Sequence, residues 1–458
     1  MKKDMLWGYL SQFLQYGAAL LILPLLLRKL SSAELGIWYV FMTISALVTM
    51  LDLGFTPTLA RNVSYVLGGA KRLLKDGFEV LSTPSPVDYS LFNAIIHAAR
   101  HIFMVLAGCA FVLLATLGSW YIVHVSQGQI AAQEVLLAWG VFVVATVINL
   151  YYKYYTPLLQ GRGLYSAFYK SSALSNLGFV IVTAILLQCG LTLLAVALGY
   201  LTSALIGRWL SWYYFHDQSF QAALHQAPPS SISTRDIFGI LWHNAWRMGL
   251  GVIGAFLILR ANTLLSSAYL GLATTAAYAL TLQVYSVLQN MSMVLFNIQQ
   301  PKLAQYRVAN EPERLRHTIQ LGIGYALGIF LCGAVILVCF GPAMIKWIGG
   351  QTGLLAFPLL IWVGIMVLLE LNHSLAASVI VTGNRVPFVK PALVSGVAIV
   401  TLSWLGLRLG GMGLTWLIAS QFTVQLIYNN WKWPYMVWLE LYRNKASPAS
   451  SSHHQMKV

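Results

Sequence analysis

The chain alternates between long apolar runs and short polar segments. A helix needs about 20 apolar residues to cross a hydrocarbon core that is about 30 Å thick. By this criterion the sequence predicts twelve transmembrane helices, at residues 5–27, 35–58, 102–125, 133–153, 171–189, 192–215, 237–259, 269–297, 318–340, 354–380, 392–408 and 411–430. An even number of spans places both termini on the same side of the membrane.

Two stretches with nearly the same sequence lie in corresponding halves of the chain. Six of seven residues agree between residues 30–36 and residues 265–271, at an offset of 235. Each stretch lies between the first and second long apolar runs of its half, where duplication of a six-helix unit would place it. Further on, Asn149 matches Asn372 at an offset of 223. The pattern predicts an all-α integral membrane protein whose twelve transmembrane helices form two pseudo-symmetric six-helix bundles.

The same pattern predicts the domain boundaries. We expect an N-terminal bundle at residues 1–217 and a C-terminal bundle at residues 237–430. Residues 218–236 between them are poor in apolar residues and contain a Pro-Pro-Ser-Ser stretch, which is typical of a linker. Residues 431–458 are expected to form a tail on the side of the linker.

Composition and charge agree with a membrane protein. Hydrophobic residues make up 58% of the chain and charged residues 9%, whereas soluble domains carry about 25% charged residues. The net charge of +15 lies in short loops between apolar runs, so it does not indicate nucleic-acid binding. The termini and the loops on their side hold 21 Lys or Arg, and the opposite loops hold five. The positive-inside rule therefore places both termini in the cytoplasm of a multi-pass protein.

The sequence offers little for catalysis or for a metal. The four cysteines lie inside apolar runs without metal-ligand spacing, so neither a metal nor a cofactor is expected. The loops on the outer side are short, and their only carboxylates are Glu34 and Glu134. A membrane-embedded glycan polymerase or ligase usually needs a longer outer loop with acidic residues, so an enzyme is disfavoured.

Basic and amide side chains inside the membrane suggest an anion site, because buried ionisable groups are costly unless they serve a wet or paired interior. Arg247 lies in the middle of the helix at 237–259, and Gln12 is its counterpart in the first half. Arg28 and Arg260 end the first helix of each half. Guanidinium groups suit a pyrophosphate, although Arg28 and Arg260 would also reach the outer interface simply by extending toward water.

Acidic and amide side chains suggest ion coupling. Asp52 continues a polar stripe on the helix at 35–58 and reads either as a protonatable or Na⁺-binding carboxylate or as a hydrogen-bonded packing residue. Glu370 and His373, late in the helix at 354–380, form a second candidate ion site, although a lone histidine is more often a core residue. Asn149 and Asn372 read either as substrate contacts or as hydrogen bonds between helices.

Four short motifs follow one another along the first half: Leu23-Pro24-Leu25, Glu34-Leu35-Gly36, Leu51-Asp52-Leu53-Gly54 followed by Arg61, and Leu159-Gln160-Gly161. In this order they resemble the O-antigen flippases and related polysaccharide exporters. These exporters belong to the MOP superfamily, which also holds the multidrug (MATE-type) exporters and the lipid II flippase. The first helix lacks the Asp common in drug exporters, and the chain lacks the two further helices of the lipid II flippase.

The resemblance implies a flippase that works by alternating access between two six-helix bundles. Its substrate would be an undecaprenyl-pyrophosphate-linked oligosaccharide, moved from the cytoplasmic to the outer leaflet of the bacterial inner membrane as part of O-antigen or other polysaccharide biosynthesis. An H⁺ or Na⁺ gradient, bilayer lipids and a polysaccharide polymerase or ligase are the expected partners. The alternatives are an exporter of small or multidrug cations from the same superfamily and, less favoured, a glycan polymerase or ligase.

Overall fold

The protein is helical throughout the part of the chain that the structure describes. The computed structural model describes residues 17, 20–75, 85–228, 232–309, 311–383 and 386–443. Residues 20–29 are helical. The other elements of the first half are α2 (Ser32–Thr49), η1 (Met50–Asp52), α3 (Phe55–Leu67), α4 (Tyr89–Leu113), η2 (Leu114–Gly118), α5 (Ser119–Ser126), α6 (Ala132–Tyr151), η3 (Tyr152–Tyr154), α7 (Tyr155–Gly161), α8 (Tyr165–Gln188) and α9 (Leu193–Phe215).

The second half follows a short connecting helix. The elements are α10 (Gln218–Gln226), α11 (Thr234–Leu259), α12 (Ala261–Tyr269), α13 (Leu272–Val308), α14 (Pro312–Ile348), α15 (Phe357–Val381), α16 (Val389–Leu409), α17 (Leu414–Ile427) and α18 (Asn429–Arg443). Among the described residues, nine helices are long and apolar enough to span a membrane, and α11 with α12, bent by 41°, makes a tenth. Residues 20–29 and α17 lie where the two remaining spans were predicted. The predicted all-helical membrane fold class is confirmed.

The second predicted helix, at 35–58, is not continuous. Leu53 and Gly54 have φ angles of 43° and 78°, in the left-handed region, so the helix stops there and restarts as α3. A side chain at Gly54 would lie 2.6 Å from Cβ of Met248 in α11. Only glycine therefore allows this turn to pack against α11, and α3 then extends beyond the predicted end to Leu67.

The segments expected as linker and tail contain helix. In the expected linker, residues 218–236, α10 occupies Gln218–Gln226 and packs Phe220 edge-on against Phe92 of α4, with ring centroids 5.2 Å apart. α11 begins at Thr234, before the expected start of the second bundle. The expected tail begins at residue 431, yet α18 continues to Arg443. Both helices carry aromatic side chains that pack against neighbours, which a reading of apolar run lengths does not detect.

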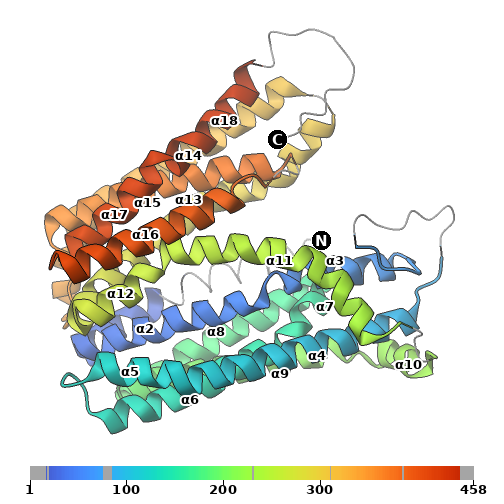
Figure 1. Ribbon diagram of the computed structural model, residues 1–458, viewed down its shortest axis with the longest axis horizontal. Coiled ribbons are helices and arrows are strands. Elements are labelled where there is room, and N and C mark those ends of the chain that lie inside the picture. The colour runs from blue at the N-terminus through green and yellow to red at the C-terminus, as the bar shows by residue number, and fades with distance from the viewer. Residues whose placement is uncertain are drawn as a thin grey trace.

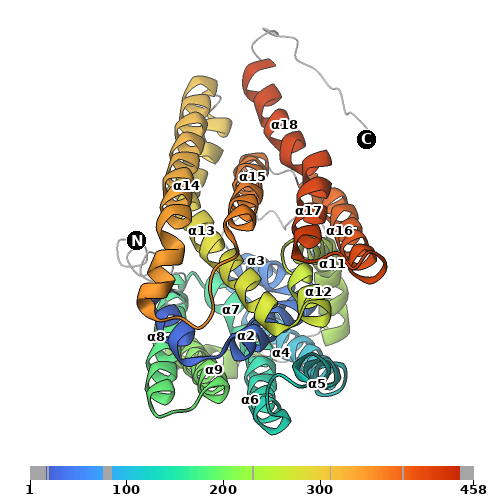
Figure 2. The same ribbon diagram turned by 90° about the vertical axis from the view of Figure 1, so that its left-hand side faces the viewer.

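The two halves meet along one side and separate toward one end (Figures 1 and 2). The apolar core falls into two clusters, one centred on each half. α11 belongs to both sides: Ile237, Leu241 and Ala245 join the core of the first half, whereas a side chain at Gly254 would lie 2.8 Å from the backbone of Ala392 in α16. In Figure 1 the halves are closest near α12 and α2 and diverge toward the end at which α10 lies.

Hydrogen bonds seal the end at which the halves meet. We call these contacts the seal. The Ser32 hydroxyl lies 3.0 Å from that of Thr352, the Gln351 backbone N–H donates to the Leu27 carbonyl at 2.7 Å, and the Tyr121 hydroxyl donates to the Leu264 carbonyl at 2.6 Å. Each bond joins one half to the other. Residues 30–36 of the first half and residues 265–271 of the second half, the two repeated stretches, thus both lie at the seal.

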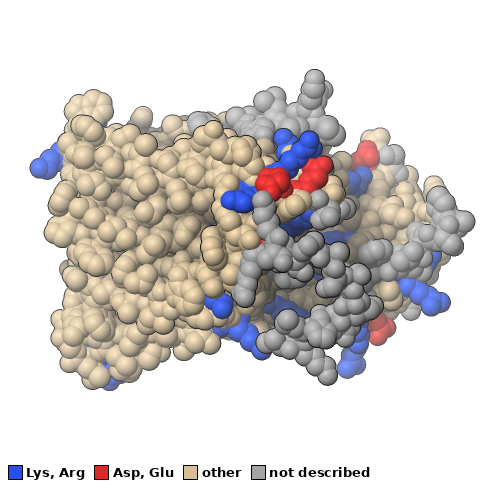
Figure 3. All heavy atoms as spheres, turned by 90° about the horizontal axis from the view of Figure 1, so that it is seen from above, with Lys and Arg blue, Asp and Glu red and all other residues tan. Residues whose placement is uncertain are grey.

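Charge is distributed as in a membrane protein. On the face seen in Figure 3, a broad band carries no charged side chain, whereas most of the visible Lys and Arg gather toward the right-hand end, the end with α10 in Figure 1. All four cysteines are exposed, on helices α4, α14 and the end of α8. Apolar side chains are also exposed along the spans, for example Trp209 and Phe340, both 60% exposed. This surface suits contact with lipid, because hydrocarbon solvates apolar groups.

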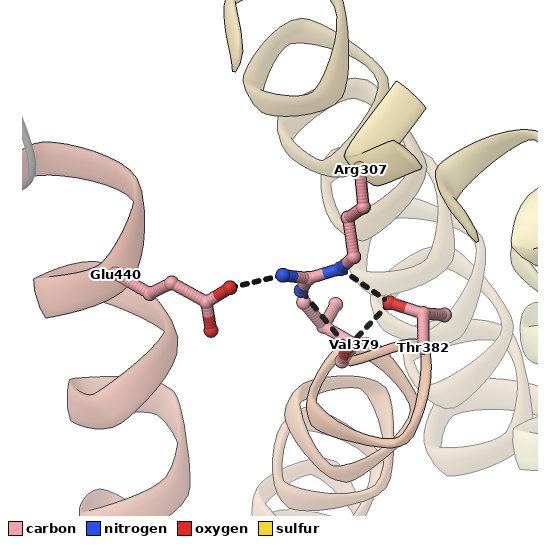
Figure 4. Close-up of polar contacts among 4 residues, drawn as sticks. All are labelled: Arg307, Val379, Thr382 and Glu440. Atoms are coloured by element: carbon pink, nitrogen blue, oxygen red, sulfur yellow. Dashed lines mark hydrogen bonds and ion pairs between the residues drawn. The ribbon is translucent and has the colours of Figure 1, made fainter. Parts of the chain in front are cut away.

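A polar clamp holds three helices of the second half together (Figure 4). Arg307 of α13 donates to the Thr382 hydroxyl at 2.9 Å and to the Val379 carbonyl at 3.1 Å, both at the end of α15. The same guanidinium forms an ion pair with Glu440 of α18. The Thr382 hydroxyl also donates to the Val379 carbonyl at 2.7 Å, so Arg307 adds two bonds to groups that already cap the end of α15.

We expect Arg307→Ala to lower the stability of the protein. The change removes three hydrogen bonds of a half-buried guanidinium, so the free energy of unfolding should fall by about 1–2 kcal/mol. The free energy of unfolding of Arg307→Lys should lie between those of the wild-type protein and Arg307→Ala, since an ammonium cannot reproduce the forked geometry. Thermal unfolding of the purified protein in detergent measures the difference. An unchanged melting temperature for Arg307→Ala would contradict this role.

Candidate substrate cavity between the halves

A cavity of about 780 Å³ lies where the two halves meet. α11, α15 and α16 form most of its wall, and α3 of the first half contributes one residue. The side chains that can bond to a ligand come from both halves: Arg61, Asn244, Arg247, Glu370, His373, Ser374, Ser378, Gln425 and Asn429. The rest of the wall is largely apolar. This combination is typical of a ligand site, where apolar walls surround a few orienting polar groups.

Arg247 is the predicted anion-binding residue that reaches this cavity. Its side chain is exposed, and its one recorded contact is the ring of Trp246, 5.9 Å from Cζ. Within the described residues no carboxylate pairs with it. A second arginine, Arg61 of α3, is exposed on the same cavity and is also free of carboxylate partners in this part of the chain. Two guanidinium groups therefore remain available to an anion.

Glu370 and His373 face the same cavity from α15. The Gln425 side chain donates to the Glu370 carboxylate at 3.1 Å, and Nδ1 of His373 lies 3.1 Å from the backbone carbonyl of Asn429. Both side chains are half-buried. Glu370 and His373 thus line the same cavity as Arg247, and each is held by one hydrogen bond to a neutral group.

A smaller cavity of about 80 Å³ continues from Glu370 toward the seal. Arg260, at the bend between α11 and α12, lines it together with Glu370, Gln421 and Gln425. Its size suits water molecules or an ion. Arg260 and Glu370 line this cavity together, but the structure shows no ion pair between them among the described residues. Arg260 does not line the main cavity, which it approaches only through the shared residue Glu370.

The other predicted site residues lie elsewhere. Arg28 is exposed beside the seal, where its backbone carbonyl accepts from Gln351. Asp52 is buried; it pairs with Lys153 of η3 at 2.9 Å and accepts from the Thr56 backbone N–H at 3.0 Å. Asn372 is half-buried on α15 and lines neither cavity. Gln12 lies outside the described residues.

Asn149 belongs to a separate group of side chains in the first half. Its Oδ1 accepts from Nε of Arg208 at 3.1 Å. Together with α8, these residues of α6 and α9 line a cavity of about 230 Å³ that shares no lining residue with the one between the halves. Asn149 and Asn372, matched by the repeat, therefore occupy different surroundings.

Arg61 lines the cavity but was not predicted as a site residue. The predicted helix ended at residue 58, so Arg61 was assigned to a loop. Leu59, Val63 and Val66 are fully buried and follow one another at helical spacing, which is a signal that α3 continues. Gln425 and Asn429, which also line the cavity, were not predicted as site residues either. Their signal in the sequence is that two amide side chains lie one turn apart on the last predicted span.

The sequence pattern of the polysaccharide biosynthesis protein family matches residues 1–306. The chain belongs to this family. The resemblance drawn from the sequence motifs is thereby confirmed, and no curated protein sequence matches the chain.

Solved structures show the same fold. A multidrug resistance transporter of the MATE family in an inward-facing conformation has a TM-score of 0.65 at 13% identity and covers 97% of this chain and 100% of its own. An outward-facing MATE transporter reaches 0.57 at 14% identity, with 97% of each chain covered. A MOP-superfamily transporter from Pyrococcus furiosus, described as having a binding pocket of reverse polarity, reaches 0.53 at 14% identity, covering 98% and 94%. The chain is a multi-pass membrane protein with the MATE transporter fold.

Proposed function

We propose that the protein is a flippase. It moves an undecaprenyl-pyrophosphate-linked oligosaccharide from the cytoplasmic to the outer leaflet of the bacterial inner membrane. The observation that carries this proposal is Arg247, a cation without a carboxylate partner in the described residues, exposed in a cavity between the two halves. Membership of a polysaccharide biosynthesis family supports a glycan as cargo.

In the proposed mechanism Arg247 and Arg61 bind the pyrophosphate. A guanidinium presents its donors as a planar fork, which suits the oxygens of a phosphate group. The two arginines come from opposite halves, on α11 and α3. The sugars occupy the rest of the cavity, where Asn244, Ser374 and Gln425 offer hydrogen bonds. The lipid tail stays in the bilayer.

Rocking of one half against the other carries the headgroup across. In this structure the seal is closed and the halves diverge toward the end at which α10 lies, in the segment predicted to be on the side of the termini (Figure 1). With both termini in the cytoplasm, as the charge distribution predicts, this is the state that accepts cargo from the inner leaflet. Breaking the seal and closing the opposite end then releases the headgroup outward.

Glu370 is proposed to couple the cycle to an ion. Its carboxylate lies in the same cavity as Arg247 and is held there by Gln425. Binding of H⁺ or Na⁺ at Glu370, with His373 beside it, would change the net charge around the pyrophosphate. Asp52 stays a weaker candidate, because Lys153 already neutralises it. A polysaccharide polymerase or ligase would act on the product at the outer leaflet.

An exporter of organic cations is the alternative. One observation favours it, namely the carboxylate of Glu370 in the main cavity. Against it stand Arg61 and Arg247, which would repel a cation from the same space.

Deletion of the gene tests the two functions against each other. A flippase predicts that one lipid-linked oligosaccharide accumulates and that surface polysaccharide disappears, and that a plasmid copy restores both. Mass spectrometry of lipid extracts identifies the intermediate, and its protection from a membrane-impermeant glycosidase shows that it stays on the cytoplasmic leaflet. Greater sensitivity to cationic drugs without such an intermediate would favour the exporter.

A further inference from the structure

A second polar cavity lies inside the first half, away from the cavity between the halves. Its volume is about 230 Å³, and α6, α7, α8 and α9 surround it. Eight of its ten lining residues are polar. These are Asn149, Thr156, Ser171, Ser172, Ser175, Asn176, Arg208 and Ser211. The span that carries Arg208, Leu193–Phe215, contains no other charged residue.

Arg208 is the one charged residue that lines this cavity. Nε donates to Asn149 at 3.1 Å, and the structure records no partner for the two terminal nitrogens among the described residues. No carboxylate lines the cavity either. A guanidinium inside a membrane span is costly, so such residues usually serve a ligand, a partner charge or a water-filled space.

Helix packing explains the serines but not the arginine. The Ser175 hydroxyl donates to the Ser203 carbonyl at 2.6 Å, and the hydroxyls of Ser171 and Ser211 donate to carbonyls of their own helices. These bonds are the usual way in which small polar residues join membrane helices. Among the described residues, no acceptor is found for the terminal nitrogens of Arg208 or for the hydroxyls of Thr156 and Ser172.

We propose that this cavity is an oxyanion site that binds a carboxylate or phosphate group no larger than one sugar residue. Arg208 supplies the charge, and Asn149, Ser172 and Thr156 supply neutral hydrogen bonds. Cavities for drug-sized ligands start at about 300 Å³, so this space admits a single small group. The group comes either from an acidic sugar or from a phosphate, free or in a lipid headgroup. The site does not depend on the cargo proposed for the cavity between the halves.

Charge-selective labelling of a cysteine tests the site. The native cysteines are first replaced, and Ser172→Cys is introduced into the full-length protein in nanodiscs. A methanethiosulfonate that carries a sulfonate is compared with one that carries a trimethylammonium group. We expect the anionic reagent to react faster, and Arg208→Gln to lower the ratio of the two rates about tenfold. Arg208→Lys should keep most of the preference.

A matched cysteine separates this site from the proposed cargo site. At Ser374→Cys, in the cavity between the halves, the ratio should respond to Arg247→Gln and not to Arg208→Gln. This position also shows that the Arg208→Gln protein is folded. A ratio at residue 172 that Arg208→Gln leaves unchanged overturns the oxyanion site, whatever happens at residue 374.

Protection experiments identify the source of the anion. Glucuronate, inorganic phosphate and glucose are each added before the reagent. Slower labelling by glucuronate alone assigns an acidic sugar, and slower labelling by phosphate assigns a phosphate group. Equal protection by glucose, or no protection by either anion, contradicts an oxyanion site.

Discussion

Replacing Arg247 by alanine is expected to reduce surface polysaccharide by about tenfold or more. The guanidinium is exposed in the cavity between the halves, and within the described residues no carboxylate competes for it. Each hydrogen bond between a charged donor and a phosphate contributes about 1.5–3 kcal/mol, which corresponds to about 10- to 150-fold in affinity. The fold should tolerate the change, because the side chain's recorded contact is the neighbouring ring of Trp246.

Complementation of the deletion strain measures this effect. Surface polysaccharide is quantified on gels and normalised to the amount of protein in the membrane. Arg408→Ala is the matched control, since Arg408 is exposed at the end of α16 and its recorded contact is the ring of Trp404. Arg247→Lys should retain part of the activity. Full polysaccharide from Arg247→Ala at normal protein level would remove the anion site from the mechanism.

Crosslinking the seal should stop transport completely. The hydroxyl oxygens of Ser32 and Thr352 are 3.0 Å apart, in different halves of the chain, so cysteines at these positions are close enough for a disulfide. Oxidation would hold the halves together at this end. The protein could then bind cargo at the end opposite the seal but could not release it past the seal.

Transport activity is measured before and after oxidation in the double variant Ser32→Cys/Thr352→Cys, from which the native cysteines have been removed. Activity should fall to the level of the deletion strain on oxidation and recover after treatment with a reducing agent. Each single cysteine variant should stay active under both conditions. Transport by a protein whose crosslink is verified on a gel would show that the seal does not open during the cycle.

The sequence was sufficient for the architecture because membrane spans follow simple rules. Apolar run length and the repeat at residues 30–36 and 265–271 predicted two related bundles, as the fold confirms. The break at Leu53–Gly54 was not predicted, because the motif around Asp52 reads as apolar helix until the backbone angles are known. Local polarity did not indicate that Lys153, a hundred positions away, neutralises Asp52.

The candidate site was predicted only in part, because the sequence does not show which helices pack against each other. Arg247, Glu370 and His373 stood out because charges are rare inside apolar runs, and the structure brings them to one cavity. Arg61 was missed, because its role depends on how far α3 extends and which way that helix faces. Asn149 was identified as a polar position, but its pairing with Arg208 follows from the packing of α6 against α9. Helical periodicity indicates a face; it does not identify the neighbour.

α11 is anchored at its start in one half of the molecule and farther along in the other. Ala245 is buried in the first core and Met248 packs against Gly54, whereas Gly254 lies against α16, so the change of side begins shortly after Arg247. A motion that parts the halves must therefore flex or twist this helix close to the guanidinium. The position of the charge and the separation of the halves are thus mechanically coupled. Cargo bound at Arg247 would act directly on the element that has to deform, without a relay through distant residues.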